Sequence, residues 1–189
     1  MTIMQIILLL VTAFFAYKVY EHMQGLNDPE ESGRPMLEEI DIDAIVDEAD
    51  RAFDAGRMLE ARELLQKAYA HDDTIAELAN RLGFVLSAMG NHEEALKLYL
   101  HSLALKEEDV THLAIASQLR TLGRLEESQE HYEKALQLDD NYEVTYFNYG
   151  NLLVEMGEIE KAKAMYQKAL EIEPELEAAK EELEKLDGR

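Results

Sequence analysis

Cysteine is absent from the 189-residue chain, and proline and glycine are scarce, with 3 and 9 residues. The lack of cysteine excludes disulfides, thiolate metal ligands, a cysteine nucleophile and the acylated cysteine of a lipoprotein anchor. Because alanine, leucine, glutamate and lysine are abundant while helix-breaking residues are few, the composition indicates an all-α protein.

Basic residues are also few, since 18 Lys and Arg stand against 40 Asp and Glu and the net charge is −22. A charge of this sign repels nucleic-acid phosphate and anionic lipid headgroups, which argues against a nucleic-acid-binding role. Hydrophobic residues make up 47% of the chain, too many for a disordered acidic tail. We therefore expect a folded domain with an apolar core.

The N-terminus is the most apolar part of the sequence. From Ile3 to Tyr17 only Gln5 and Thr12 are not apolar. A helix continuing to Tyr20 would be about 27 Å long, close to the roughly 30 Å thickness of the hydrocarbon core of a bilayer. These features predict an uncleaved transmembrane anchor over residues 1–23.

The flanking charges give a prediction of orientation. Lys18 and Arg34 follow the apolar run and no basic side chain precedes it, so the positive-inside rule predicts a single-pass protein of a bacterial inner membrane with the remaining chain in the cytoplasm. A periplasmic location is the alternative, and a signal peptide cleaved after Val11-Thr12-Ala13 also stays open. Residues 24–41 contain two of the three prolines and are expected to form a flexible linker.

Residues 42–176 consist of four sequence repeats of 33 or 34 residues. The repeats span 42–75, 76–108, 109–142 and 143–176. A glycine occupies the fifteenth position of each repeat, where a helix must end and the chain must reverse. These glycines are Gly56, Gly90, Gly123 and Gly157.

Small and large residues recur at other fixed positions. The eighth positions hold the small residues Ala49, Gly83, Ala116 and Gly150. The twentieth and twenty-seventh positions hold Ala61, Ala68, Ala95, Ser102, Ser128, Ala135, Ala162 and Ala169. The twenty-fourth positions hold the large residues Leu65, Tyr99, Tyr132 and Tyr166. The pattern predicts two helices and a tight turn in each repeat, with apolar faces that need a neighbouring repeat to be buried.

This pattern resembles the tetratricopeptide repeat family. The fourth repeat carries the family signature at Tyr146, Tyr149, Gly150, Leu153, Ala162, Tyr166, Ala169 and Pro174. Repeats one and three depart from it at the eighth position, where they have alanine. The resemblance implies an α-solenoid, a right-handed superhelix of stacked helix pairs with a concave groove. Residues 177–189 are expected to add a capping helix and tail, because Leu176, Ala179, Leu183 and Leu186 form an apolar stripe.

No pattern typical of an active site is present in the sequence. The six histidines are His22, His71, His92, His101, His112 and His131, and none belongs to a His-Glu-x-x-His motif. The glycines of the repeats occupy the eighth and fifteenth positions, which leaves none for a phosphate-binding loop. We therefore expect no enzymatic activity, no cofactor, no metal and no small-molecule substrate.

The candidate site is the concave groove that the resemblance implies. In the family, positions two, five, nine and twelve of each repeat point into the groove. From these positions we predict as peptide or partner contacts Asn80, Phe84, Leu113, Ser117, Arg120, Phe147 and Asn151. The amides can hydrogen-bond an extended peptide backbone, and the two phenylalanines offer apolar surfaces. Packing between repeats is the alternative role for these side chains.

The groove positions also indicate the charge of the partner. Family members that grip the C-terminal carboxylate of a chaperone use groove lysines, and these positions hold none, so a carboxylate clamp is not expected. Asp43, Asp50 and Glu77 instead suit a partner with basic residues.

Taken together, these observations predict a membrane-anchored scaffold that binds a protein or peptide partner and recruits or assembles a membrane-associated complex. An exported periplasmic assembly module and a non-catalytic regulatory subunit of a membrane enzyme complex are the alternatives.

Overall fold

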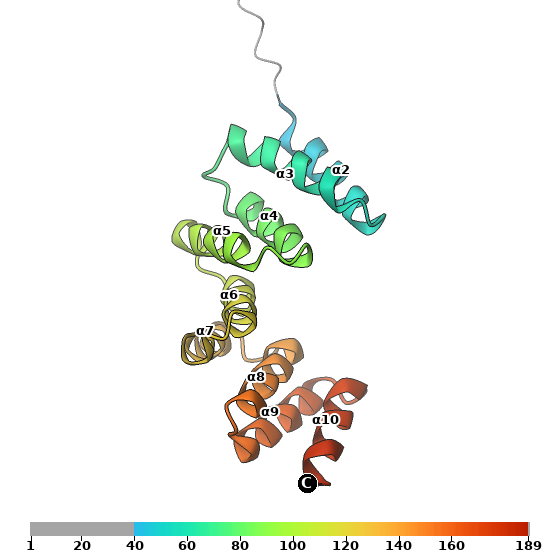
Figure 1. Cartoon of the computed structure of the whole chain (residues 1–189), viewed down its shortest axis with the longest axis vertical. Helices are drawn as coiled ribbons and strands as arrows, with labels where there is room; N and C mark the ends of the chain where they lie inside the picture. The colour runs from blue at the N-terminus through green and yellow to red at the C-terminus, as the bar shows by residue number, and fades with distance from the viewer. Residues whose placement is uncertain (1–39, 189) are drawn as a thin grey trace, which may run out of the picture. The chain divides into compact units, whose positions relative to one another are not determined.

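The computed structural model describes residues 40–188, and residues 41–189 form a compact unit that we describe by itself. Its described part consists of helices joined by short turns, without a β-strand (Figure 1). The helices are α2 (Ile42–Asp54), α3 (Met58–His71), α4 (Ala76–Ala88), α5 (His92–Leu105), α6 (Asp109–Thr121), α7 (Leu125–Leu138), α8 (Glu143–Glu155), α9 (Ile159–Ile172) and α10 (Glu177–Asp187). The prediction of an all-α helical repeat solenoid is confirmed.

From α2 to α10, each helix packs against the next one in the chain, so the unit is a stack of antiparallel pairs. The first helices of successive pairs also touch, since α4 contacts α6 and α6 contacts α8. One side of the stack is therefore formed by α2, α4, α6 and α8, and residues of these helices line the candidate site.

The turn inside each pair depends on glycine in the left-handed region, as Gly56 illustrates with φ of 74°. The N–H of Gly56 donates to the carbonyl of Phe53, and the N–H of Arg57 donates to the carbonyl of Ala52, both at 2.8 Å. This Schellman arrangement satisfies the last carbonyls of α2 and starts α3 in the opposite direction. The same geometry recurs at Gly90, Gly123 and Gly157.

The core inside each pair is built from the recurring small and large residues. Tyr132 and Tyr166 are fully buried, and so are the alanines that face the partner helix, such as Ala95 and Ala162. Small residues allow the helix axes to approach, and the large ring then fills the remaining space. Because every pair repeats this arrangement, the apolar core runs along the whole stack in two clusters that meet at α6.

The last helix covers the end of the stack. Helix α10 packs against α9 and buries Ala179 and Leu186, while Leu176 and Leu183 are partly buried against the same cluster. The remaining surface of α10 carries charged side chains such as Lys180, which pairs with Glu177.

The structure corrects one part of the predicted fold. Within residues 40–188 no helix is long and apolar enough to cross a membrane. The longest described helices have 14 residues, about 21 Å against the roughly 30 Å needed, and each has a polar face. A transmembrane helix as part of the fold, and with it a single-pass inner-membrane protein with cytoplasmic repeats, is therefore contradicted. The predicted anchor, residues 1–23, and the linker up to residue 39 lie outside the described residues.

Candidate functional site

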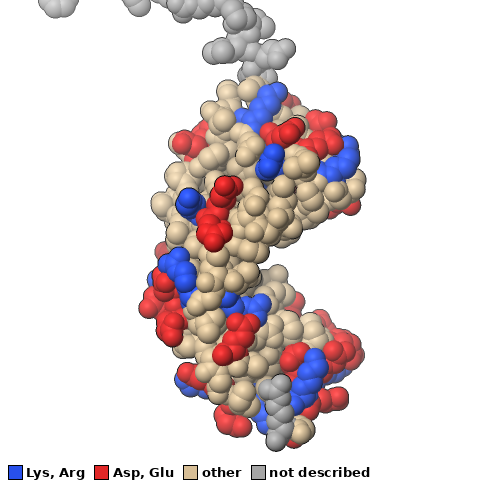
Figure 2. Space-filling view, viewed as in Figure 1, with Lys and Arg blue, Asp and Glu red and all other residues tan. Residues whose placement is uncertain are grey.

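A hollow of about 580 Å³ opens between the first helices of the first three pairs. Figure 2 shows that the repeat unit is hollowed along one side, with uncharged surface next to the hollowed part. The side chains that define the hollow come from α2 (Asp50, Phe53, Asp54), α4 (Asn80, Arg81, Phe84) and α6 (Val110). Because three different repeats contribute, the hollow exists only when these repeats are stacked.

The apolar part of the hollow is centred on two aromatic rings. Phe53 and Phe84 lie with their ring centroids 5.0 Å apart and their planes inclined by 46°. Phe84 nevertheless leaves 56% of its surface exposed, and Val110 on the neighbouring helix leaves 50% exposed. Large apolar side chains gathered in a concavity are typical of a binding site rather than of ordinary surface.

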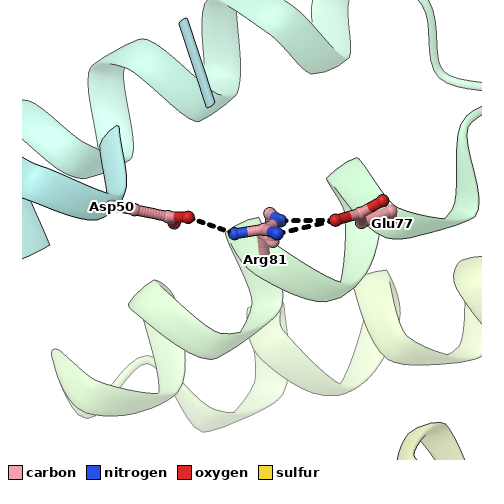
Figure 3. Close-up of polar contacts among 3 residues, drawn as sticks. All are labelled: Asp50, Glu77 and Arg81. Carbon is pink, nitrogen blue, oxygen red and sulfur yellow. Dashed lines mark hydrogen bonds and ion pairs between the residues drawn. The ribbon is translucent and has the colours of Figure 1, made fainter. Parts of the chain in front are cut away.

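Arg81 spans the polar side of the hollow (Figure 3). Its guanidinium donates to Glu77 Oε1 through Nε at 2.9 Å and through a terminal nitrogen at 2.7 Å, and its other terminal nitrogen binds Asp50 on α2. Burial alone would lower the pKa of Arg81, but the hydrogen bonds and charges of Glu77 and Asp50 outweigh this effect and raise it. The guanidinium is thus a permanent positive charge that ties α4 to α2.

Asn80 ties α4 to the next pair. Its Nδ2 donates to Thr111 Oγ1 on α6 at 2.9 Å. Its Oδ1 is buried and has no hydrogen-bond partner within the described part of the chain. Because this oxygen is buried, it is not open to the hollow, and Asn80 contributes to the site by joining α4 to α6.

Beneath these groups the hollow is closed by the core. Tyr99 from α5 and Leu65 from α3 reach it from the second helices of the first two pairs. Burial raises the pKa of the Tyr99 phenol, which therefore stays neutral. The bottom of the hollow is rigid because it belongs to the first core cluster.

The remaining predicted contact residues lie outside this hollow, on α6 and α8. Arg120 donates to Glu155 Oε1 at 3.0 Å, and Asn151 Oδ1 accepts from the Tyr166 hydroxyl at 2.8 Å. Phe147 lies against the same tyrosine with a centroid distance of 5.8 Å. Each of these side chains is partly buried, as are Leu113 and Ser117.

The structure thus brings two of the predicted residues, Asn80 and Phe84, into one hollow. Sequence reasoning missed Arg81, which lies at the sixth position of its repeat, next to the positions considered. Its spacing from Glu77, four residues earlier on the same helix, was a signal that an ion pair forms there. No signal within one repeat could show that Asp50 completes the arrangement.

A metal site has no support in the described residues. Among them, no group of three or more His, Asp or Glu could hold a metal ion. The closest histidine pair, His112 and His131, has its Nδ1 atoms 2.9 Å apart and contributes to packing between α6 and α7. The side chains that line the hollow are apolar, hydrogen-bonding and charged groups.

Comparison with solved structures identifies helical repeat proteins. A crystal structure of MamA is 19% identical, with a TM-score of 0.67 over 73% of this chain and 81% of that one. MamA 41-end from Desulfovibrio magneticus RS-1 is 17% identical, with a TM-score of 0.71 over 78% and 84% of the two chains. YrrB, described as a TPR protein with an unusual peptide-binding site, is 18% identical, with a TM-score of 0.61 over 71% and 70%. At these identities the likeness shows the fold alone.

Comparison at the level of sequence identifies the family. No curated protein sequence matches the chain. The family model described as Tetratricopeptide repeat matches residues 74–140 and 108–175, which together cover more than half of the chain. Proteins with this repeat are in general non-catalytic scaffolds that bind protein or peptide partners. With the helix pairs, the turn glycines and this match in agreement, the chain belongs to the tetratricopeptide repeat family.

Proposed function

We propose that this chain is a non-catalytic scaffold that recruits a partner protein by binding a segment of it in the hollow between α2, α4 and α6. The observation that carries the proposal is Phe84, a large apolar side chain that is 56% exposed within a concavity. Covering about 100 Å² of apolar surface at this position would contribute roughly 2.5 kcal/mol to binding.

The neighbouring polar groups give the hollow a fixed shape before a partner arrives. Arg81 joins α4 to α2, and Asn80 joins α4 to α6. A site held in this way loses little conformational entropy on binding, which favours affinity for a short segment.

The other predicted contacts stay a proposal for a longer partner segment. They continue along α6 and α8 and comprise Leu113, Ser117, Arg120, Phe147 and Asn151. Since each of them is partly buried in contacts within the stack, we expect them to contribute less to binding than Phe84.

Selection from a random peptide library displayed on phage, with the full chain as bait, tests the proposal. Enriched peptides are then synthesised with a fluorescent label and titrated by anisotropy against the wild-type chain, Phe84→Ala and Leu138→Ala. Leu138 is a matched control, because it is 51% exposed but does not line the hollow. Phe84→Ala is expected to weaken binding at least about tenfold while Leu138→Ala leaves it unchanged. Failure to enrich any peptide, or equal binding by Phe84→Ala, would contradict the proposed site.

A further inference from the structure

We propose that the segment recognised in the hollow is a short basic–apolar motif, in which a bulky apolar side chain is flanked by Lys or Arg. This inference rests on the proposed function and specifies its partner. It follows from the charges that surround the apolar part of the hollow.

Carboxylates outnumber cations around Phe84. Asp50 and Asp54 lie four residues apart on α2 and therefore share one face of that helix, and both line the hollow. Glu77 adds a third carboxylate through its contact with Arg81. One guanidinium thus faces three carboxylates, and the hollow keeps a net negative charge.

The arrangement leaves an unused carboxylate at the rim. Asp50 and Glu77 both bind Arg81, whereas Asp54 is exposed and has no ion pair within residues 40–188. A Lys or Arg next to an apolar residue seated on Phe84 could reach Asp54 without breaking an existing contact. The net charge of −22 would attract such a partner over longer distances.

An acidic partner fits the same groups poorly. The guanidinium of Arg81 already donates to two carboxylates, so an incoming anion would have to displace one of them. Two other acidic candidates are disfavoured for the same reason. A second copy of the chain carries −22, and residues 21–39 of the chain itself contain six acidic residues against one arginine.

The peptide selection described above also tests this inference, through the sequences that it enriches. We expect peptides with a bulky apolar residue and a Lys or Arg within about three positions of it. A labelled peptide with this pattern should bind Asp54→Asn and Asp50→Asn about three- to fivefold more weakly than the wild-type chain. Glu130→Gln is the matched control, because it removes the same charge from an exposed position on α7 outside the hollow.

The outcomes separate this inference from the function on which it rests. If no peptide is enriched, both fail. If enriched peptides depend on Phe84 but carry no basic residue, or carry acidic ones, the proposed function stands and the basic–apolar motif is refuted. If Glu130→Gln weakens binding as much as Asp54→Asn, the attraction is a general effect of net charge and the inference is refuted.

Two further measurements test the other occupants. If a synthetic peptide of residues 21–39 displaced the labelled peptide, the hollow would be assigned to a segment of the chain itself. Concentration-dependent association in sedimentation velocity that is lost in Phe84→Ala would assign the hollow to a second copy. Either result would overturn the inference. The inference is supported if the chain is a monomer and the peptide of residues 21–39 does not displace the labelled basic–apolar peptide.

Discussion

Helices α8 and α9 approach each other closely at Gly150, and this predicts the effect of Gly150→Ala on stability. A Cβ added to this residue would lie 2.6 Å from Cε1 and 2.8 Å from Cδ1 of Tyr166. The ring has little freedom to retreat, because it is fully buried and its hydroxyl donates to Asn151 Oδ1 at 2.8 Å. We expect Gly150→Ala to destabilise the protein, although alanine favours helix more than glycine does.

The magnitude follows from opposing contributions. Alanine in place of glycine inside a helix stabilises by about 1 kcal/mol. Overpacking a tight core costs about 1–3 kcal/mol, and displacing the Tyr166 hydroxyl from Asn151 adds about 1 kcal/mol. The net loss in the free energy of unfolding should be about 1–3 kcal/mol, which lowers the midpoint temperature by about 3–9 °C for a domain of this size.

Urea and thermal unfolding followed by circular dichroism at 222 nm measure this effect, since the chain has no tryptophan for fluorescence. The matched control is Gly150→Ala combined with Tyr166→Leu, which reproduces the first repeat, where Ala49 and Leu65 occupy the corresponding positions. In the Tyr166→Leu background we expect Gly150→Ala to stabilise, because only the helix preference of alanine remains. A stabilising effect of Gly150→Ala with Tyr166 in place would refute the reasoning.

Three other predictions follow from the structure. Burial and the neighbouring His112 lower the pKa of His131 to about 4, so the unfolded chain binds the proton more tightly than the folded one. The contribution of neutral His131 to the free energy of unfolding is therefore complete above about pH 6.5 and is lost as the pH falls toward 4. When the pH is lowered from 7 to 5, the free energy of unfolding measured in urea should fall by about 1 kcal/mol less in His131→Gln than in the wild-type chain. Gly157→Ala should destabilise by about 1 kcal/mol in the same assay, because φ is 78° there and no added contact compensates. Asn151→Ala should lower the free energy of unfolding by about 1–2 kcal/mol, measured by thermal unfolding. In a Tyr166→Phe background the same substitution should have no such effect, because there is no hydroxyl that needs an acceptor.

The fold could be predicted from the sequence because its determinants are local and repeated. The fifteenth-position glycines have positive φ, as turn glycines must, and a Cβ added at the eighth-position glycines Gly83 and Gly150 would lie 2.9 and 2.6 Å from a tyrosine ring. The positive φ restricts the fifteenth position to glycine whatever the rest of the chain does, whereas the eighth position accepts glycine or alanine. Four occurrences at a constant spacing then identify the helix pairs.

The site was less predictable because it depends on contacts between repeats. The contact of Asp50 with Arg81 and that of Asn80 with Thr111 each join residues 31 positions apart, slightly less than one repeat. Their formation depends on the angle at which one pair stacks on the next, and the position pattern within a repeat does not specify this angle. Arg120 makes such a contact with Glu155 of the next repeat, whereas Asn151 and Phe147 contact Tyr166 of their own repeat.

The hollow lies in the first three helix pairs, so its geometry does not depend on the packing inside the last pair. In the described part of the chain each helix pair packs mainly against its neighbours, so the geometry of the hollow is set by the Asp50–Arg81 contact of α2 with α4, by the α4–α6 contacts and by the first core cluster. Gly150 and Tyr166 belong to the last pair, and Tyr166 contributes to the second cluster. Changes there alter the free energy of unfolding without altering the spacing of Phe53, Phe84 and the carboxylates. Substitutions in the last pair should therefore change stability while the first three pairs keep the shape of the proposed partner-binding hollow.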